Sequence, residues 1–412
     1  MEHILDLSAP RIKGADLSTL PEVEKAGGLF FDEATGNRQQ ATGDAGKAFP
    51  LGGRCHRAAP ASPMTDEGAS QQEDALVILK RHGMNLVRLR LWNDPCDPDG
   101  TPYGGGTSDL PRVLEMARRC KALGLPWLLD LHYSDFWADP GKQFPPKAWA
   151  GYDAEGLARA VYDFTRETLE TLKAEELLPA IVAVGNEITN GILWPLGKVP
   201  EWPNLVRFLA AGLRAVREAA PSARTMLHLD NGGNRALYAA WFDSWFAYGG
   251  PDFDCIGLSY YPIWHGTLEE LRENLHALAA RFGKPLLVTE SSAAFTLADC
   301  SPWEGLEPGK EHGLVVGEAA AAKVPYPPTP EGQCEFLREL WAVSRSVPRD
   351  LGRGLVWWEP AWLPVPGVGW TTPAGLAYIG ETGACGNQWA NQCMFDYDGR
   401  GLPVLETLEK LI

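Results

Sequence analysis

Two apolar runs of the sequence each end in a glutamate. Val-Gly-Asn-Glu closes one run at Glu187, and Leu-Val-Thr-Glu closes another at Glu290. A buried glutamate is costly unless it is paired, so such an ending needs an explanation. Two carboxyl groups that flank a bound sugar can break a glycosidic bond, and about 5–5.5 Å between them implies retention of the anomeric configuration. A salt bridge at a strand end is the alternative, and it would be preferred for either residue alone.

Polar and aromatic side chains end the other apolar runs too. Arg88 and Arg90 lie two residues apart, on one side of a strand, where either could hold a carboxylate ionised. His132 and His228 raise the alternative of a metal site, which is less favoured because the first run has no His-x-His pair. A serine hydrolase is less favoured still, since no Gly-x-Ser-x-Gly turn occurs. Further candidates at these strand ends are Asp130, Asp230, Tyr260, Tyr261, Trp358 and Glu359.

Eight short apolar runs alternate with helical periodicities, and this pattern predicts an α/β fold, the (β/α)8 TIM barrel. An open doubly wound sheet is the second choice, but no Gly-x-Gly-x-x-Gly turn follows the first run. In a barrel the carboxyl ends of all strands meet at one face, so Glu187 on the fourth and Glu290 on the seventh are expected to come together. The runs begin at Ile12, Leu86, Pro126, Ile181, Thr225, Phe253, Leu286 and Gly354.

Capping residues mark several of the intervening helices. Asp109 and Gly124 are expected to bound one helix. Thr267 and Glu270 form a capping box ahead of another, and Thr329-Pro330 begins a third. These signals place helices between the strands, as a barrel requires.

Long loops follow the first, seventh and eighth strands, at residues 35–70, 294–328 and 364–392. A barrel builds its active site from loops at this end of the strands, so we expect them to surround the site. For the Ala- and Gly-rich first loop, a disordered insertion is an equally good interpretation. No repeat or second domain is evident, and residues 1–412 are expected to form a single catalytic domain.

The composition narrows the class of partner. A formal net charge of −16 over 412 residues disfavours nucleic acid and anionic membranes. We expect a monomer, located in the cytoplasm as written because no secretory signal opens the chain, or secreted if a signal was removed. The eight cysteines contain no Cys-x-x-Cys pair and are expected to be mostly reduced, with one loop disulfide left open. The 16 tryptophans suit sugar stacking, although core packing better explains any single one.

A combination of specific motifs is spread over nearly the whole chain. On these motifs the sequence resembles glycoside hydrolase family 53, the arabinogalactan endo-β-1,4-galactanases. The matching segments are GADLS at Gly14, NLVRLRLWNDP at Asn85, YGGG at Tyr103, LDLHYSDFWADPGKQ at Leu129, VGNEITNGILWP at Val184, HLDNG at His228, IGLSYYPIWHGTL at Ile256, VTES at Val288, PTPEGQ at Pro328, WWEPAW at Trp357 and MFDYDG at Met394.

The resemblance implies a TIM barrel that hydrolyses internal β-1,4-galactosidic bonds of (arabino)galactan with retention and requires no cofactor. Its substrates would be β-1,4-galactan and galacto-oligosaccharides. It implies Glu187 as general acid/base and Glu290 as nucleophile. Together with the polar strand ends, the predicted substrate-binding residues are Arg88, Trp92, Asp130, His132, Asn186, His228, Asp230, Tyr261, Trp358 and Trp362.

The sequence departs from the family pattern at three places. The loop 35–70 is longer than usual, and Ser291-Ser292-Ala293 stands where an aromatic residue is often nearby. Some bacterial members bind a structural calcium in the loop after the seventh strand. The acidic residues of this loop do not match that pattern, so no residue is assigned to a calcium site. Two functions remain as alternatives: another retaining β-glycanase of the same clan, or a galactan-binding protein without catalysis. The acidic residues of the seventh-strand loop are Asp299, Glu304 and Glu307.

Overall fold

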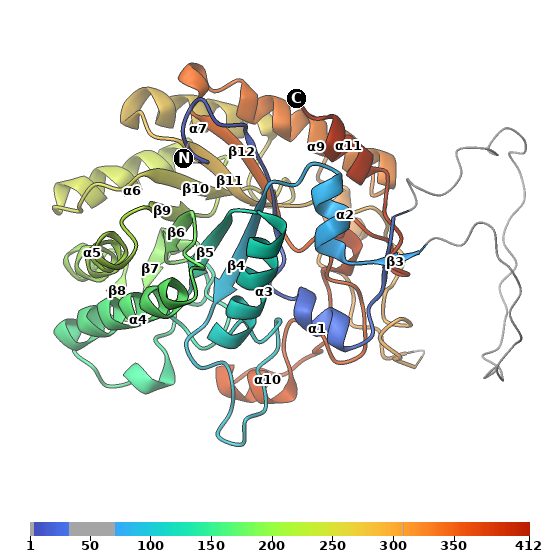
Figure 1. The fold of residues 1–412 in the computed structure, drawn as a ribbon, viewed down its shortest axis with the longest axis horizontal. Coiled ribbons are helices and arrows are strands. Elements are labelled where there is room, and N and C mark those ends of the chain that lie inside the picture. Colours follow the sequence, from blue (N-terminus) through green and yellow to red (C-terminus); the bar gives the residue numbers. More distant parts are fainter. Residues whose placement is uncertain (1–3, 33–70, 308) are drawn as a thin grey trace, which may run out of the picture.

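A computed structural model describes residues 4–32, 71–307 and 309–412. In this part of the chain, eight parallel strands close into a barrel that helices surround, which confirms the predicted TIM barrel (Figure 1). Each predicted apolar run overlaps one barrel strand. In order around the barrel, the strands are β1 (Ile12–Asp16), β12 (Gly352–Trp357), β11 (Leu286–Ser291), β10 (Cys255–Ser259), β9 (Arg224–Leu229), β6 (Ile181–Val184), β5 (Trp127–Leu131) and β4 (Leu86–Leu91).

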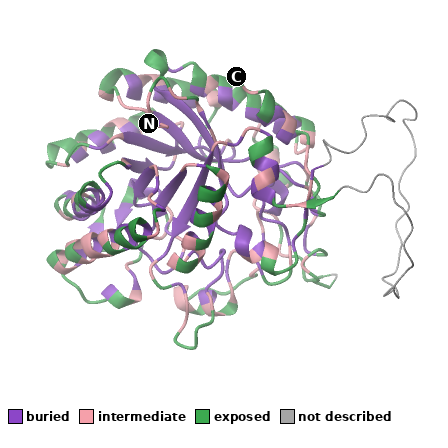
Figure 2. Ribbon diagram, viewed as in Figure 1, coloured by how far each residue is buried: buried purple, intermediate pink, exposed green. Residues whose placement is uncertain are grey.

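The barrel strands are buried on both faces (Figure 2). Their interior changes from apolar to charged along their length. Leu86 and Leu128 belong to an apolar cluster within the barrel. Two residues further along the same strands, Arg88 and Asp130 point to the same side and are fully buried. Apolar packing therefore closes one end of the barrel, while charged groups gather at the carboxyl ends of the strands.

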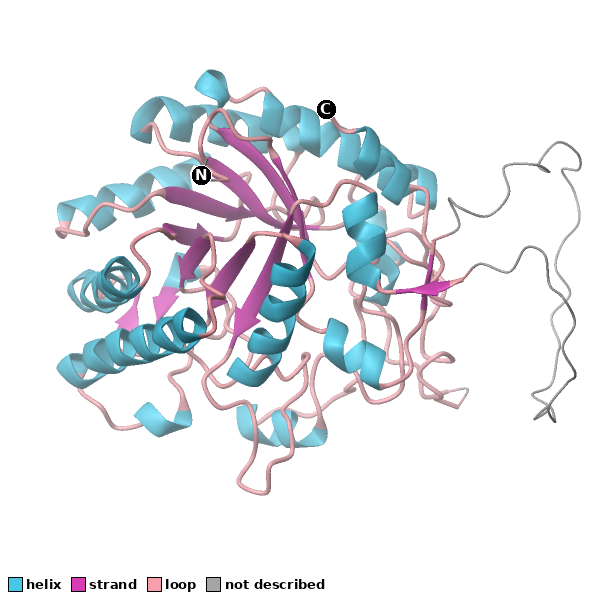
Figure 3. Cartoon of the chain, viewed as in Figure 1, coloured by secondary structure: helices cyan, strands magenta, loops and turns pink. Residues whose placement is uncertain are grey.

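The helices form a shell around the strands (Figure 3). The capping predictions are confirmed: the Asp109 side chain accepts from Arg112 N, Gly124 ends that helix at φ 64°, and Thr267 forms a capping box. The described helices are α1 (Leu20–Lys25), α2 (Ala75–Arg81), α3 (Leu110–Leu123), α4 (Ala154–Ala174), α5 (Trp202–Ala219), α6 (Arg235–Ala247), α7 (Leu268–Phe282), α8 (Glu318–Ala321), α9 (Pro330–Arg345), α10 (Pro373–Ile379) and α11 (Val404–Lys410).

Two of the long loops carry short elements of their own. The loop after β11 contains α8, and the loop after β12 contains α10. The side chain of Asn391 ties them together, because its Nδ2 donates to the carbonyl oxygens of Thr296 and Val316, both at 2.9 Å. The predicted loop 35–70 lies outside the described residues. Two small antiparallel pairs complete the fold, β2 (Phe30–Phe31) with β3 (Gln72–Glu73) and β7 (Gly191–Ile192) with β8 (Gly197–Lys198).

Two remaining features of the fold are the state of its cysteines and the character of its helices. The seven cysteines that the structure describes are all free thiols. Over the same residues, no helix combines the length and the apolar character that crossing a membrane requires.

Candidate active site

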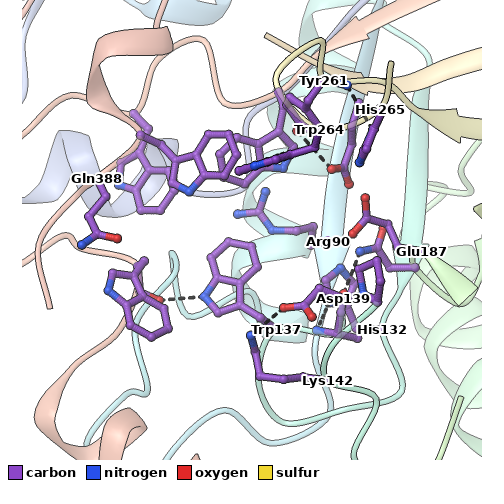
Figure 4. A pocket seen from close by; sticks show the side chains of 18 residues that line it. Arg90, His132, Trp137, Asp139, Lys142, Glu187, Tyr261, Trp264, His265 and Gln388 are labelled. Atoms are coloured by element: carbon purple, nitrogen blue, oxygen red, sulfur yellow. Dashed lines mark hydrogen bonds and ion pairs between the residues drawn. The ribbon is translucent and has the colours of Figure 1, made fainter. Parts of the chain in front are cut away.

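A pocket of about 430 Å³ contains Glu187 and Glu290 among its lining residues (Figure 4). Glu187 comes three residues after β6 ends, and Glu290 lies near the carboxyl end of β11. One carboxylate oxygen of each and a ring nitrogen of His228 lie within 4.8 Å of one another. The two glutamates that end apolar runs in the sequence therefore meet in one pocket.

The Glu290 carboxylate is held by a cation and a hydroxyl. Arg88 Nη2 lies 2.7 Å from Glu290 Oε1, and the Tyr261 hydroxyl donates to Oε2 at 3.2 Å. Burial raises the pKa of Glu290 to about 7, while the Arg88 guanidinium acts in the opposite direction. Both oxygens thus have a partner that favours the ionised form.

Arg88 is itself fixed by three further side chains. Its Nη1 lies 2.5 Å from Asp16 Oδ2, and its Nη2 lies 2.8 Å from both Asp130 Oδ2 and Asn186 Oδ1. Burial alone would raise the pKa of Asp130, but Arg88 and then His132 hold it well below its usual range. Because every partner is buried, the guanidinium has a single orientation, pointed at Glu290.

Glu187 has different surroundings. Its backbone adopts φ 47°, a left-handed conformation that is costly for a residue with a Cβ and that concentrates at functional sites. Burial, followed by the negative charges of Glu290 and Asp230, raises the pKa of Glu187 well above its ordinary value. The Ser259 hydroxyl is its hydrogen-bonding neighbour, and none of the ion pairs among the described residues involves it. Its surroundings therefore favour the protonated form of Glu187, whereas Arg88 favours the ionised form of Glu290.

The two histidines beside the pair are neutral. Burial lowers the pKa of His228 to about 3, and its Nε2 lies 2.8 Å from the Ser259 hydroxyl oxygen. Burial also lowers the pKa of His132. His132 Nδ1 accepts hydrogen bonds from Trp92 Nε1 and Ala138 N, which leaves the proton on Nε2, 2.9 Å from an Asp130 oxygen. The histidines thus support the carboxylates and add no positive charge.

Comparison with known proteins identifies the family. Residues 56–408 match the family described as "Glycosyl hydrolase family 53". The chain belongs to glycosyl hydrolase family 53. This confirms the resemblance seen in the sequence and makes the chain a glycoside hydrolase, of a family that generally needs no cofactor.

Individual relatives agree with the family 53 assignment. The chain is 37% identical to a Niallia circulans protein named "Uncharacterized protein in bgaB 5'region", over 97% of this chain and 93% of the relative. It is 31% identical to the endo-beta-1,4-galactanase of Bacillus subtilis (strain 168), over 97% and 85%. The solved family 53 catalytic domain of Ignisphaera aggregans has 36% identity and a TM-score of 0.81, over 97% and 96%.

The other residues predicted for this family 53 site divide into two groups. One group lines the pocket beside the glutamates: His132, Asn186, Tyr261, Trp358 and Trp362. The other group lies outside that lining: Arg88, Trp92, Asp130, His228 and Asp230. Of these, Trp92 is fully buried against His132, and Asp230 accepts from the Asn231 side chain at 2.7 Å. Their contact with a substrate stays a prediction.

Several lining residues were not singled out from the sequence. Trp137 lies in the motif that follows β5, so it was inside a recognised segment. Trp264 follows Tyr261 in the loop after β10, and Trp389 lies in the predicted long loop after β12. Arg90, which the sequence pattern had singled out together with Arg88, also lines the pocket. The remaining additions are Ala138, Asp139, Pro140, Lys142, His265, Trp370 and Gln388.

Two of the acidic residues after β11, Asp299 and Glu304, have protein partners in this family 53 barrel. Asp299 accepts hydrogen bonds from Ser301. Glu304 Oε2 lies 2.6 Å from His312 Nε2, and Glu304 Oε1 accepts from the backbone N–H of Asn387 at 2.6 Å. The bond between Glu304 and Asn387 fastens the loop after β11 to the loop after β12.

Proposed function

We propose that the chain is an endo-β-1,4-galactanase that works with retention, using Glu187 as general acid/base and Glu290 as nucleophile. The observation that carries this is the unequal pairing of two carboxyl groups whose oxygens lie within 4.8 Å. This separation is close to the spacing of about 5–5.5 Å that suits direct attack by one carboxylate, and it is shorter than the spacing of about 6.5–9.5 Å of inverting enzymes. The cation beside Glu290, and the lack of an ion pair at Glu187 among the described residues, support these two roles.

In the first step, Glu290 attacks the anomeric carbon as an ionised carboxylate. Glu187 transfers its proton to the glycosidic oxygen, so the leaving sugar departs as an alcohol and a glycosyl-enzyme ester remains. Arg88 and the Tyr261 hydroxyl keep Glu290 in the attacking orientation before the bond forms. Burial raises the pKa of Glu187 well above its ordinary value, which favours the protonated form that this step requires.

In the second step, Glu187 has become the base. It takes a proton from a water that attacks the anomeric carbon, and the Glu290 ester is broken with a second inversion. The two inversions give net retention. Neither step uses a Lewis acid, so we propose that catalysis requires no metal, and a structural calcium is not part of the proposal.

The substrate class rests on the relatives and on the pocket. The Bacillus subtilis relative is named an endo-beta-1,4-galactanase. Tryptophans supply much of the lining, and sugars stack on aromatic faces. We therefore propose β-1,4-galactan and galacto-oligosaccharides as substrates. The residues that would stack on them are Trp137, Trp264, Trp358, Trp362, Trp370 and Trp389.

A polymer comparison tests the proposal. The enzyme is incubated with β-1,4-galactan, cellulose and mannan, and viscosity and oligosaccharide profiles are recorded. We expect rapid viscosity loss on galactan alone, with the β-anomer as the first product by NMR. Equal or faster cleavage of cellulose or mannan would indicate another β-glycanase of the same clan. Binding of galactan without cleavage would indicate a protein that has lost catalysis.

A further inference from the structure

We propose that the leaving-group side of the cleft continues past the pocket onto a second sugar-binding surface. This surface, here called the leaving-group surface, consists of the Asp139–Lys142 ion pair followed by the aromatic pair Phe144–Trp194. It would take the galactosyl residues on the reducing-end side of the cleaved bond. The inference rests on the proposed function, because it takes Glu187 as the acid.

The direction of the cleft follows from the acid. Figure 4 shows Gln388 at one end of the pocket and Glu187 at the other, with Arg90 between them. The proton donor must lie beside the oxygen that leaves, so the leaving sugar lies on the Glu187 side. Two segments lie next to Glu187: residues 138–144, in the middle of the loop after β5, and residues 188–198, in the loop after β6.

The ion pair provides polar contacts at the edge of the pocket. Asp139 Oδ2 lies 2.7 Å from Lys142 Nζ, and both side chains line the pocket while remaining about one-third exposed. Asp139 is close enough to Glu187 for its charge to contribute to the raised pKa of that residue. An ammonium and a carboxylate offer donors and acceptors to the hydroxyl groups of the first leaving sugar.

The aromatic pair provides an apolar surface beyond the ion pair. Phe144 is 44% exposed, which is unusual for a ring of its size. It meets the partly exposed Trp194 at 6.4 Å between ring centroids, with the rings perpendicular. Lys198 Nζ lies 4.0 Å from the Trp194 ring centroid, so a charged donor accompanies the apolar surface. Exposed rings beside a polar donor suit a sugar, which has apolar C–H faces and a rim of hydroxyl groups.

Hydrogen bonds tie this surface to the backbone of the acid. Trp194 N donates to Gln143 O at 2.8 Å, and Gln143 Nε2 donates to Asn186 O at 2.8 Å. Asn190 Nδ2 donates to Pro140 O at 2.9 Å. The two loops therefore hold the leaving-group surface at a fixed position relative to Glu187. Because this surface is already ordered, binding of a sugar chain there costs little conformational entropy.

The test is the position of cleavage in galactohexaose labelled at its reducing end. Removing a binding ring on the leaving-group side should move the preferred cut one bond toward the label. For Phe144→Ala we expect that shift, together with a three- to tenfold lower kcat/KM on the hexaose. Hydrolysis of nitrophenyl galactobioside should change less than about twofold, because its leaving group is too short to reach Phe144. Trp194→Phe, which keeps a ring, should lie between Phe144→Ala and the wild type.

The matched control is Phe246→Ala. Phe246 is 39% exposed and lies at the carboxyl end of α6, on the helical shell. This variant should cut the hexaose at the wild-type position. A wild-type cleavage pattern in Phe144→Ala, or an equal loss on both substrates, would overturn the inference. A wild-type enzyme that is inactive on galactohexaose would contradict the proposed function, and the inference with it.

Discussion

Two arginines of β4 each hold a glutamate at a strand end, and the two pairs look alike at first. Arg88 Nη2 lies 2.7 Å from Glu290 Oε1, and Arg90 Nη2 lies 2.6 Å from Glu359 Oε1. Asp16 bridges the two arginines through its two oxygens. Burial raises the pKa of both glutamates to about 7, with the arginines opposing it.

The pairs differ in what else reaches the carboxylate. Glu359 accepts hydrogen bonds from the backbone N–H and the hydroxyl of Thr19, and it does not line the pocket. Arg90 stacks against Trp137 and Trp358, at 4.7 and 5.7 Å from the ring centroids. Glu290, by contrast, lines the pocket and lies beside Glu187. A raised pKa and an arginine partner therefore do not separate the two glutamates. The proposed mechanism also needs a carboxylate that lines the pocket and lies beside a second carboxyl group, as Glu290 does.

The largest effect is expected when each of these two carboxylates is replaced in turn. Glu290→Gln should lower kcat/KM on galactan by at least about 10⁴-fold, as expected for loss of a nucleophile. Glu359→Gln should keep activity within about tenfold and instead lower the free energy of unfolding by about 1–3 kcal/mol, because Arg90 loses a buried charged partner. Kinetics and urea unfolding measure both. A Glu359→Gln enzyme that is folded yet as inactive as Glu290→Gln would refute the distinction.

A second comparison uses the neighbouring tryptophans of the eighth strand. Trp357 is fully buried in β12, whereas Trp358 lines the pocket next to Trp389. Trp357→Ala should cost about 3–5 kcal/mol of stability. Trp358→Ala should raise KM about tenfold with a smaller loss of melting temperature, since its ring faces the site. Measuring both quantities on the same samples separates the roles, and a purely structural Trp358 would lose activity only in step with unfolding.

The pH dependence sharpens the assignment of the proton. Activity requires Glu290 ionised and Glu187 protonated, so kcat/KM should rise with pH as Glu290 loses its proton and fall as Glu187 loses its own. Burial raises both pKa values, so both limbs should lie above the ordinary carboxyl pKa of 4.5. With a nitrophenyl galactoside, Glu187→Gln should lack the alkaline limb. Its persistence in that variant would place the proton on another group.

The smallest expected effect is that of metal removal. Treatment with EDTA should leave kcat unchanged at a temperature where circular dichroism shows an intact fold, because neither step uses a Lewis acid. Among the described residues, the candidate metal cluster of Glu187, His228 and Glu290 already has the Arg88 guanidinium beside it. Complete loss of activity with the fold intact would contradict the proposed mechanism.

Much of the barrel was predictable because its cause is local. A strand buried on both faces must be apolar almost throughout, so β6 and β11 stand out in the sequence, and the glutamates that follow or end them stand out in turn. Helix ends were predictable for the same reason. Asp109 caps the first turn of α3 and Gly124 ends its last turn, so each effect depends only on neighbouring residues.

The pocket wall was less predictable because it depends on contacts between distant segments. The strand-end rule selects both Trp92 and Trp358, yet only Trp358 lines the pocket, since Trp92 turns to donate to His132. Trp137 donates through its Nε1 to Trp370 O at 2.7 Å, 233 residues away in the sequence. A local sequence pattern therefore cannot predict whether a tryptophan such as Trp137 lines the pocket.

The assignment of Glu187 as acid/base and Glu290 as nucleophile is the central claim, and one paired measurement tests it. Glu187→Ala and Glu290→Ala are each mixed with a nitrophenyl galacto-oligosaccharide, whose good leaving group needs no acid. Glu187→Ala should show a burst of nitrophenolate followed by slow turnover, and azide should restore turnover with a β-configured galactosyl azide. Glu290→Ala should show no burst, and any azide product should be α-configured. The reverse pattern of burst and product anomer would contradict the assignment.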